Sequence, residues 1–149
     1  MMTFTGAFDF LSNFYPAKIE IDGVCYQNAE AAFQAQKCIN PADRIEFSDL
    51  PAVKAKRRGR QVKLRPDWES VRLSVMARVV GAKFMQNPNL AVRLVATGMM
   101  PLVEGNIWGD TFWGVDARTG NGENHLGKIL MNVREDLLRK ELNQLNREV

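Results

Sequence analysis

One long stretch of helical periodicity is the strongest constraint that this chain of 149 residues places on its fold. Residues 68–86, WESVRLSVMARVVGAKFMQ, lie between a Pro-Asp pair and an Asn-Pro pair, and their apolar side chains recur with the period of an α-helix. The apolar face of this expected helix also carries Arg72 and Lys83, and a cation among apolar side chains is costly unless it is paired. We expect the Arg72 stem to reach solvent, whereas a buried partner and a surface position are equally compatible with Lys83.

Local signals predict several shorter elements around this helix. Residues 18–26, KIEIDGVCY, are typical of a hairpin with Asp22-Gly23 as its two-residue turn. Asn28 is placed to cap a helix that continues toward Pro41. Further helices are expected at residues 42–47, from Pro51 into the following basic residues, at 89–96 and at 126–146, and a short strand at 101–104. These elements predict one α+β domain over residues 1–149, mostly helical, with a small β-sheet or hairpin.

Composition restricts the chemistry that the chain can perform. A single histidine, His125, removes most zinc sites and the usual Ser-His-Asp and Cys-His hydrolase arrangements. We therefore expect carboxylates and lysines to carry any reaction, with no metal and no cofactor. Cys25 and Cys38 lack CxxC spacing, which favours reduced packing residues. Without a leader-like or membrane-length apolar run, the expected location is cytoplasmic, with no membrane partner.

The basic residues are concentrated in one segment although the net charge is only +3. Residues 54–65 contain Lys54, Lys56, Arg57, Arg58, Arg60, Lys63 and Arg65. Such a run is compatible with a solvated connection, and it equally suits the phosphate of a nucleotide or nucleic acid.

The segment EAAFQAQK, residues 30–37, predicts an acid and an amine on one helical face. At 100° per residue, one quadrant carries Glu30, Phe33, Gln34 and Lys37, and small residues occupy the opposite side. Glu30 and Lys37 would then lie about 10 Å apart along the axis, which is the size of a small substrate. Phe33 lies between them and needs a cover of protein or ligand.

A loop rich in glycine and tryptophan supplies further polar and aromatic candidates. Residues 105–124 follow Glu104 and contain Trp108, Asp110, Trp113 and Asp116 before Asn124, the expected N-cap of the last helix. Together with Trp68 and Lys83, these residue types fit cleavage at a sugar attached to a base. Bases stack on tryptophan, and carboxylates stabilise positive charge at the anomeric carbon or activate water.

Short motifs along nearly the whole chain resemble, in order, those of the NADAR superfamily. They are SNFYP at 12–16, EAAFQAQK at 30–37, GR at 59–60, DWESVR at 67–72, VMARVVGAKFMQN at 75–87, LVE at 102–104, WGVD at 113–116 and GENHLGKILMNVR at 122–134. Within this superfamily the chain resembles the YbiA-like N-glycosidases of riboflavin-biosynthesis intermediates. The resemblance implies hydrolysis of the bond between a ribose phosphate and an aminopyrimidine, with release of ribose 5-phosphate. Related members with these motifs remove ADP-ribose from guanine in nucleic acid.

The resemblance also implies particular site residues. It places Glu30, Trp68 and Asp116 among the functionally critical positions. The family pattern at the last of these is Trp-Gly-Asp, whereas this chain has an inserted Val115, so Asp110 is the alternative carboxylate. Asn13 and Glu104 are further candidates for contacts with the base or the ribose, beside Phe33, Lys83, Trp108 and Trp113.

In both reactions of the family, the sugar is joined to an exocyclic amino group. A glycosylamine of that kind can open to an imine, which an unprotonated lysine can capture as its own Schiff base. Lys37 is the preferred nucleophile, with Glu30 moving protons, provided that burial or a neighbouring cation such as Lys83 lowers the pKa of Lys37. The alternative is direct attack by water, with Glu30 or Asp116 as the base and Lys37 holding a phosphate or sugar hydroxyl.

A module that binds ADP-ribose or a nucleotide without cleaving it is the competing hypothesis. The modest net charge favours a small nucleotide-like substrate, and nucleic acid enters only as an ADP-ribosylated substrate. The sequence carries no signal for an oligomeric state.

Overall fold

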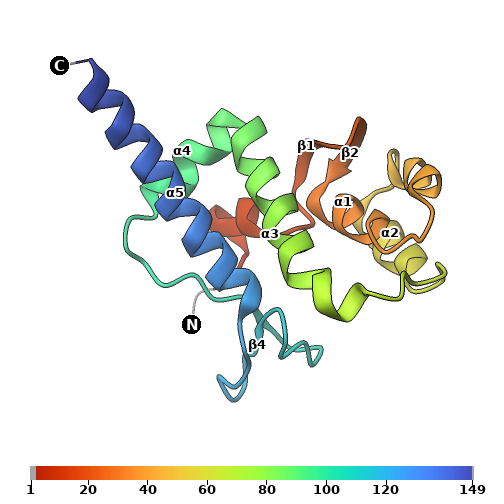
Figure 1. The fold of residues 1–149 in the computed structure, drawn as a ribbon. Helices are drawn as coiled ribbons and strands as arrows, with labels where there is room; N and C mark the ends of the chain where they lie inside the picture. Colours follow the sequence, from red (N-terminus) through yellow and green to blue (C-terminus); the bar gives the residue numbers. More distant parts are fainter. Residues whose placement is uncertain (1–2, 149) are drawn as a thin grey trace. The chain divides into compact units, whose positions relative to one another are not determined.

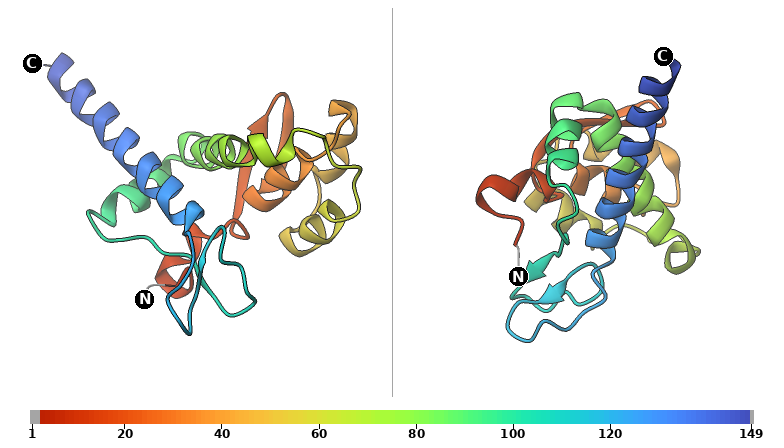
Figure 2. Two further views of the ribbon diagram at one scale, coloured as in Figure 1. Left: turned by 60° about the horizontal axis from the view of Figure 1, so that its bottom comes forward. Right: turned by 90° about the vertical axis from the view of Figure 1, so that its left-hand side faces the viewer.

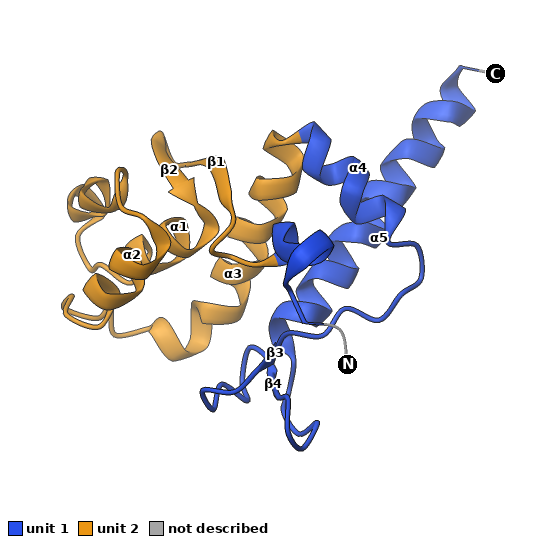
Figure 3. Cartoon of the chain, turned by 180° about the vertical axis from the view of Figure 1, so that it is seen from behind, with its two compact units in different colours: residues 1–11, 88–149 blue, residues 12–87 orange. Residues whose placement is uncertain are grey.

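The computed structural model describes residues 3–148 and is mostly helical, with two small pairs of strands (Figure 1). This confirms the expected α+β class. The chain divides into two compact units, Ser12–Asn87 and Met1–Leu11 with Pro88–Val149 (Figure 3). Among the described residues, no helix has the length and apolar character needed to cross a membrane.

The hairpin of the unit Ser12–Asn87 forms as predicted. Strands β1 (Pro16–Ile21) and β2 (Val24–Asn28) pair antiparallel. Asp22 and Gly23 both have positive φ, at 50° and 83°, which is the conformation of a type I′ turn whose twist matches that of the paired strands. Alternate residues of β1 are buried, so one face of the hairpin packs on the helices of this unit.

Helix α1 (Ala29–Ala35) is short, and all seven of its residues are buried. Asn28 caps it as predicted, because its side chain accepts a hydrogen bond of 2.7 Å from the Ala31 amide. The amide of Glu30 donates to the carbonyl of Asn13 at 3.0 Å. Two of the orphan amides at this buried helix start are therefore satisfied by segments outside the helix.

The expected continuation of this helix to Pro41 is wrong. The helix ends at Ala35, and the Lys37 amide bonds the Gln34 carbonyl in a tighter turn. Cys38 then pairs with Leu64 in an isolated antiparallel bridge. Pairing with a distant segment thus overrides the local helical pattern, and Lys37 lies on a turn beyond the helix.

The other helices of this unit agree with the sequence. A 3-10 helix covers Pro41–Phe47, α2 covers Ala52–Gly59 after Pro51, and α3 covers Trp68–Gln86. The basic run is therefore helical in its first half rather than a flexible connection. Helix α1 packs against α2, α3 and the hairpin (Figure 1).

The second unit combines a 3-10 helix (Gly6–Leu11) with α4 (Pro88–Ala96) and α5 (His125–Arg147). Strand β3 (Gly105–Asn106) pairs in parallel with β4 (Val115–Asp116), so the strand expected at 101–104 is wrong. The loops around these strands lie at the start of α5 (Figure 2), where the Leu126 amide bonds the Trp113 carbonyl.

Two expectations for α5 need correction. Asn124 is at the N-cap position with φ of 52°, but its side chain makes no cap hydrogen bond. Instead it donates to the Leu102 carbonyl and accepts from the Glu104 amide, which fixes the chain entering β3. The apolar periodicity of this helix also predicts a buried stripe of Leu126, Ile129, Leu130, Val133, Leu137 and Leu138. Only Leu126 and Leu130 of this stripe are buried, and Leu138 is 37% exposed.

The cysteines are both free, and only Cys38 is a packing residue, because Cys25 is exposed.

The cap of α1 generates a stability prediction. Replacing Asn28 by Ala removes the bond to Ala31 and a second bond to the Leu50 carbonyl, so we expect a loss of about 1–2 kcal/mol in the free energy of unfolding. Asn40→Ala, which removes the exposed cap of the following 3-10 helix, is the matched control and should cost less. Urea denaturation measures both; equal losses would contradict a special role for the buried cap.

Candidate active site

A buried carboxylate and a buried amide form the centre of the candidate site. Glu30 lies in the first turn of α1 and is 8% exposed. Gln34, one turn later, donates its Nε2 hydrogen to Glu30 Oε1 at 2.8 Å. This hydrogen bond fixes the orientation of the carboxylate within the unit.

A close contact with α2 holds Gln34 in turn. Its other amide atom, Oε1, lies against Gly59, and a Cβ at position 59 would overlap it. The absence of a side chain at Gly59 therefore gives the amide room to reach Glu30.

Phe33 is covered by protein, which answers the question that the sequence raised about this ring. The centroids of Phe33 and Trp68 are 5.2 Å apart with the rings tilted by 56°, and both residues are buried. Trp68 is thus mainly a packing residue, and one part of its ring faces the lysine. The Lys37 Nζ lies 5.8 Å from the centroid of the Trp68 ring, within range of a cation–π contact.

Lys37 is half-buried, and its environment lowers the pKa of its amine. Burial lowers the pKa of Lys37; the carboxylate of Glu30 opposes this effect, and the charges of Arg60 and Lys56 lower the pKa further. A nucleophilic lysine requires a lowered pKa, and the pKa of Lys37 is shifted in that direction. Arg60 and Lys56 belong to the basic run at residues 54–65. The sequence indicated this run as suited to phosphate and gave no sign that it affects the pKa of Lys37.

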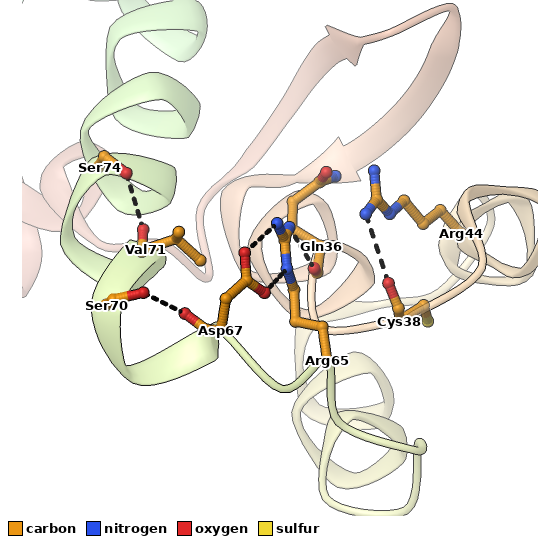
Figure 4. A network of polar contacts seen from close by, with 8 residues as sticks. All are labelled: Gln36, Cys38, Arg44, Arg65, Asp67, Ser70, Val71 and Ser74. Carbon is orange, nitrogen blue, oxygen red and sulfur yellow. Dashed lines mark hydrogen bonds and ion pairs between the residues drawn. The ribbon is translucent and has the colours of Figure 1, made fainter.

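A polar network around Arg65 holds the turn that carries Lys37. The Arg65 amide donates to the Lys37 carbonyl at 2.9 Å. The Arg65 guanidinium donates to the Gln36 carbonyl (Figure 4). The same guanidinium pairs with both carboxylate oxygens of Asp67, at 2.7 and 3.0 Å. Because Trp68 follows Asp67, this network fixes the start of α3 beside the lysine.

The sequence was compatible with either a buried, partnered Lys83 or a Lys83 at the surface. Lys83 is 1% exposed and has a partner, so the first interpretation holds. Its Nζ donates to the Ser12 carbonyl at 2.9 Å and lies 5.9 Å from the Tyr15 ring centroid. Arg72 behaves as expected, since it is half-buried and pairs at 3.4 Å with the exposed Glu69. Lys83 thus anchors the segment that begins at Ser12.

Asn13 lies in that same segment, beside the start of α1. Its backbone carbonyl accepts from Glu30, and its side-chain Nδ2 lies 3.4 Å from the sulfur of Met76. The six candidates of this unit, namely Asn13, Glu30, Phe33, Lys37, Trp68 and Lys83, therefore belong to one set of packed elements.

The remaining candidates belong to the second unit. Asp110 has a structural role, because its Oδ1 accepts from the amides of Phe112 and Trp113 at 3.1 and 2.9 Å and so fixes the loop. The Asp116 carboxylate accepts from the Arg118 amide at 2.8 Å and is half-buried. It also pairs with the Arg118 guanidinium at 3.9 Å, so both carboxylates interact with their own loop.

The aromatic residues of this loop differ in exposure. Trp108 is 65% exposed, whereas Trp113 is half-buried with its ring 4.8 Å from that of Phe112. Trp108 thus has the accessible face that base stacking requires. Glu104 is half-buried, and its backbone pairs with Val115 and Asn124.

Residues 3–148 contain no group of three or more His, Cys, Asp and Glu side chains suited to hold a metal ion. A cavity of about 580 Å³ in the unit Ser12–Asn87 is lined by the segment after α1 and the end of the basic run, and none of the predicted site residues lines it. The candidate site is therefore identified by its side chains and not by this cavity.

Sequence reasoning missed the supporting residues. Gln34 was expected on the face of Glu30 without a role of its own, although its spacing of four residues from an acid in a helix is a recognisable signal. Arg65 and Asp67 gave only a weaker signal, because their contacts depend on the fold.

The unit Ser12–Asn87 thus holds a buried carboxylate, Glu30, within electrostatic range of Lys37, whose pKa is lowered. The chain belongs to the NADAR domain family, whose model matches residues 3–138. The solved NMR structure of the E. coli protein YbiA superposes with a TM-score of 0.82 at 35% identity, over 95% of this chain and 85% of that one.

Named relatives agree with this family. N-glycosidase YbiA of Shigella flexneri serotype 5b is 41% identical over 129 residues, which cover 85% of this chain and 79% of the relative. Riboflavin biosynthesis protein VVA0006 of Vibrio vulnificus is 41% identical over 132 residues, 86% of this chain, but the chain spans only 35% of that protein. The expectation of an enzyme that acts on N-glycosyl bonds is confirmed at the level of the family.

The contact between α2 and Gln34 generates a prediction with a matched control. Gly59→Ala should lower the free energy of unfolding by about 1–3 kcal/mol, because the new methyl group overlaps Gln34. Gly81→Ala in α3 adds the same methyl group where no other atom lies within 4 Å, and should stabilise the helix by about 0.5–1 kcal/mol. Urea titrations of the two variants should give shifts of opposite sign; a stabilised Gly59→Ala protein would contradict the packing described.

Proposed function

We propose that this chain hydrolyses the N-glycosidic bond of ribosylaminopyrimidine phosphates, intermediates of riboflavin biosynthesis, and releases ribose 5-phosphate. The observation that carries the proposal is the pairing of buried Glu30 with a half-buried Lys37 of lowered pKa in one packed unit. The names of the relatives, N-glycosidase and riboflavin biosynthesis protein, support this choice of substrate.

The proposed reaction proceeds through a Schiff base on Lys37. The glycosylamine opens to an imine, and the neutral Lys37 amine adds to its C1, so that a bond from lysine to carbon forms. Glu30 gives a proton to the pyrimidine amine, which leaves with the bonding electron pair of its bond to C1. Water then adds to C1 of the lysine imine, and ribose 5-phosphate departs as the lysine takes back its electron pair and a proton.

Asp116 is the carboxylate that we assign to the alternative in which water attacks C1 directly. In that route Glu30 or Asp116 is the base, and Lys37 holds a phosphate or sugar hydroxyl. Asn13, Trp68, Lys83, Glu104, Trp113 and Asp110 are retained as supporting residues of the site or of its loop. The family match spans both units, and we infer one functional domain over residues 1–149 that acts in the cytoplasm.

Removal of ADP-ribose from guanine is the second candidate function, because it breaks the same type of bond. The exposed Trp108 ring favours a substrate with a large base. A parallel assay of ribosylaminopyrimidine phosphate and a guanine-ADP-ribosylated oligonucleotide decides between them. A protein that binds either compound without cleaving it would instead be a binding module.

Glu30→Gln should reduce turnover by a factor of about 10²–10⁴, because the amide cannot transfer protons while it keeps the shape of the side chain. Substrate affinity, measured by calorimetry, should change little. Glu69→Gln replaces an exposed carboxylate in α3 and serves as the control, with full activity expected. Wild-type turnover in Glu30→Gln would remove Glu30 from the proposed mechanism.

Borohydride added during turnover should trap the sugar on Lys37 as a stable amine, detected by peptide mass spectrometry. The trapping rate should rise with pH through the pKa of Lys37, because only the neutral amine adds to C1. Since burial lowers that pKa, the rise should occur below the value of 10.5 for an ordinary lysine.

The controls for trapping are Lys37→Arg, which should give no adduct, and Lys54→Arg, which changes an exposed lysine of α2 and should leave the adduct intact. Turnover by the wild-type protein without any adduct on Lys37 would support direct water attack.

A further inference from the structure

One edge of α2 places two cations next to the Glu30 and Lys37 pair. The buried stripe of α2, formed by Ala52, Ala55 and Gly59, packs toward α1. At 100° per residue, Lys56 and Arg60 border this stripe on the same side, one turn apart. By the same geometry, Lys54 and Arg57 lie on the far side of the helix.

Side-chain contacts confirm that this edge adjoins the site. Gly59, the neighbour of Arg60, touches the Gln34 amide that bonds Glu30. The Lys56 Nζ lies 5.8 Å from the ring centroid of Phe14, the residue after Asn13. Lys56 and Arg60 also lower the pKa of Lys37, which places their charges within its electrostatic range.

The local charge balance is positive. The charged groups that shift the pKa of Lys37 are one carboxylate, Glu30, and two cations, Arg60 and Lys56. The other arginines of α2 and α3 that form ion pairs have carboxylate partners elsewhere, as in Arg58 with Glu46 and Arg78 with Asp22. Arg60 is exposed and takes part in none of the ion pairs found within residues 3–148, so its guanidinium is available to an anion.

We propose that Lys56 and Arg60 form a subsite for the phosphate on C5 of the substrate ribose. The assignment rests on the proposed function, in which Lys37 acts on C1 of the same sugar. A phosphate monoester carries nearly two negative charges at neutral pH, which offset the surplus positive charge beside Lys37. Arg60 supplies the planar fork that binds phosphate oxygens in pairs, and Lys56 supplies a compact charge.

The shared chemistry is a ribose with phosphate on C5, which occurs in the free pyrimidine nucleotide as a monoester and in ADP-ribose as part of a diphosphate.

The test compares kcat/KM for ribosylaminopyrimidine phosphate with kcat/KM for the same compound without its phosphate. The ratio cancels the effect of each substitution on Lys37 in the free protein, because kcat/KM for both substrates refers to the same free protein. For Lys56→Gln and Arg60→Gln we expect the ratio to fall about tenfold each, the loss of one charge-assisted bond. The matched controls Lys54→Gln and Arg57→Gln should keep the wild-type ratio.

Two outcomes would overturn the subsite. If the ratio stays constant in Lys56→Gln and Arg60→Gln while both kcat/KM values fall, the two cations act only on Lys37 and do not bind phosphate. If the ratio falls equally in the control variants, the effect is a general attraction of anions by the basic run. A guanine-ADP-ribosylated oligonucleotide, run as a further arm, identifies the source: a larger loss for the monoester supports the free nucleotide, and a larger loss for the oligonucleotide supports ADP-ribose.

A separate binding measurement distinguishes failure of the subsite from failure of the proposed function. If the wild-type protein cleaves none of these compounds, the N-glycosidase proposal fails. Calorimetry with ribose 5-phosphate and with ribose then tests the subsite directly. Binding of the phosphate alone, weakened in Arg60→Gln but not in Arg57→Gln, supports it, whereas equal affinity in all variants refutes it.

Discussion

The burial of a seven-residue helix is the constraint on which the rest of the unit Ser12–Asn87 depends. Helix α1 is enclosed on all sides, so water cannot satisfy the polar groups at its ends. The Asn28 side chain and the Asn13 carbonyl accept hydrogen bonds from the first amides of the helix. The Arg65 amide donates to the carbonyl of Lys37 in the turn after the helix. Segments distant in sequence must therefore converge on α1, and in doing so they bring Trp68 and Gly59 beside Glu30 and Lys37.

The same enclosure shapes the electrostatics of the site. A buried charge is costly unless hydrogen bonds or opposite charges offset the loss of water. Glu30 receives the Gln34 amide, and Lys83 donates to a backbone carbonyl, so both are held in fixed orientations. Lys37 lies at the margin, where partial burial and nearby cations shift its protonation toward the neutral form. The three groups therefore differ in depth, from Lys83 at 1% exposed to the half-buried Lys37.

Local signals predicted the hairpin and most of the helices, and distant contacts explain several of the predictions that failed. The prolines around α3, the Asp22-Gly23 turn and the Asn28 cap act within a few residues, and each was predicted correctly. The end of α1 was wrong because a bridge between Cys38 and Leu64 competes with the helix. Asn124 bonds the chain before β3 rather than its own helix, and no local pattern shows that. For the site, helical periodicity predicted Glu30 and Lys37 on one face, but Lys37 lies on the turn after α1, and the Gly59 contact with Gln34 depends on packing between helices.

The position of Lys37 on a turn rather than within α1 separates the bonds that hold its backbone from the surroundings of its side chain. The backbone is held by bonds from its own amide to Gln34 and from Arg65 to its carbonyl, and neither involves the amine. A different side chain at position 37 therefore leaves both backbone hydrogen bonds in place, and the conformation of the turn does not depend on the amine.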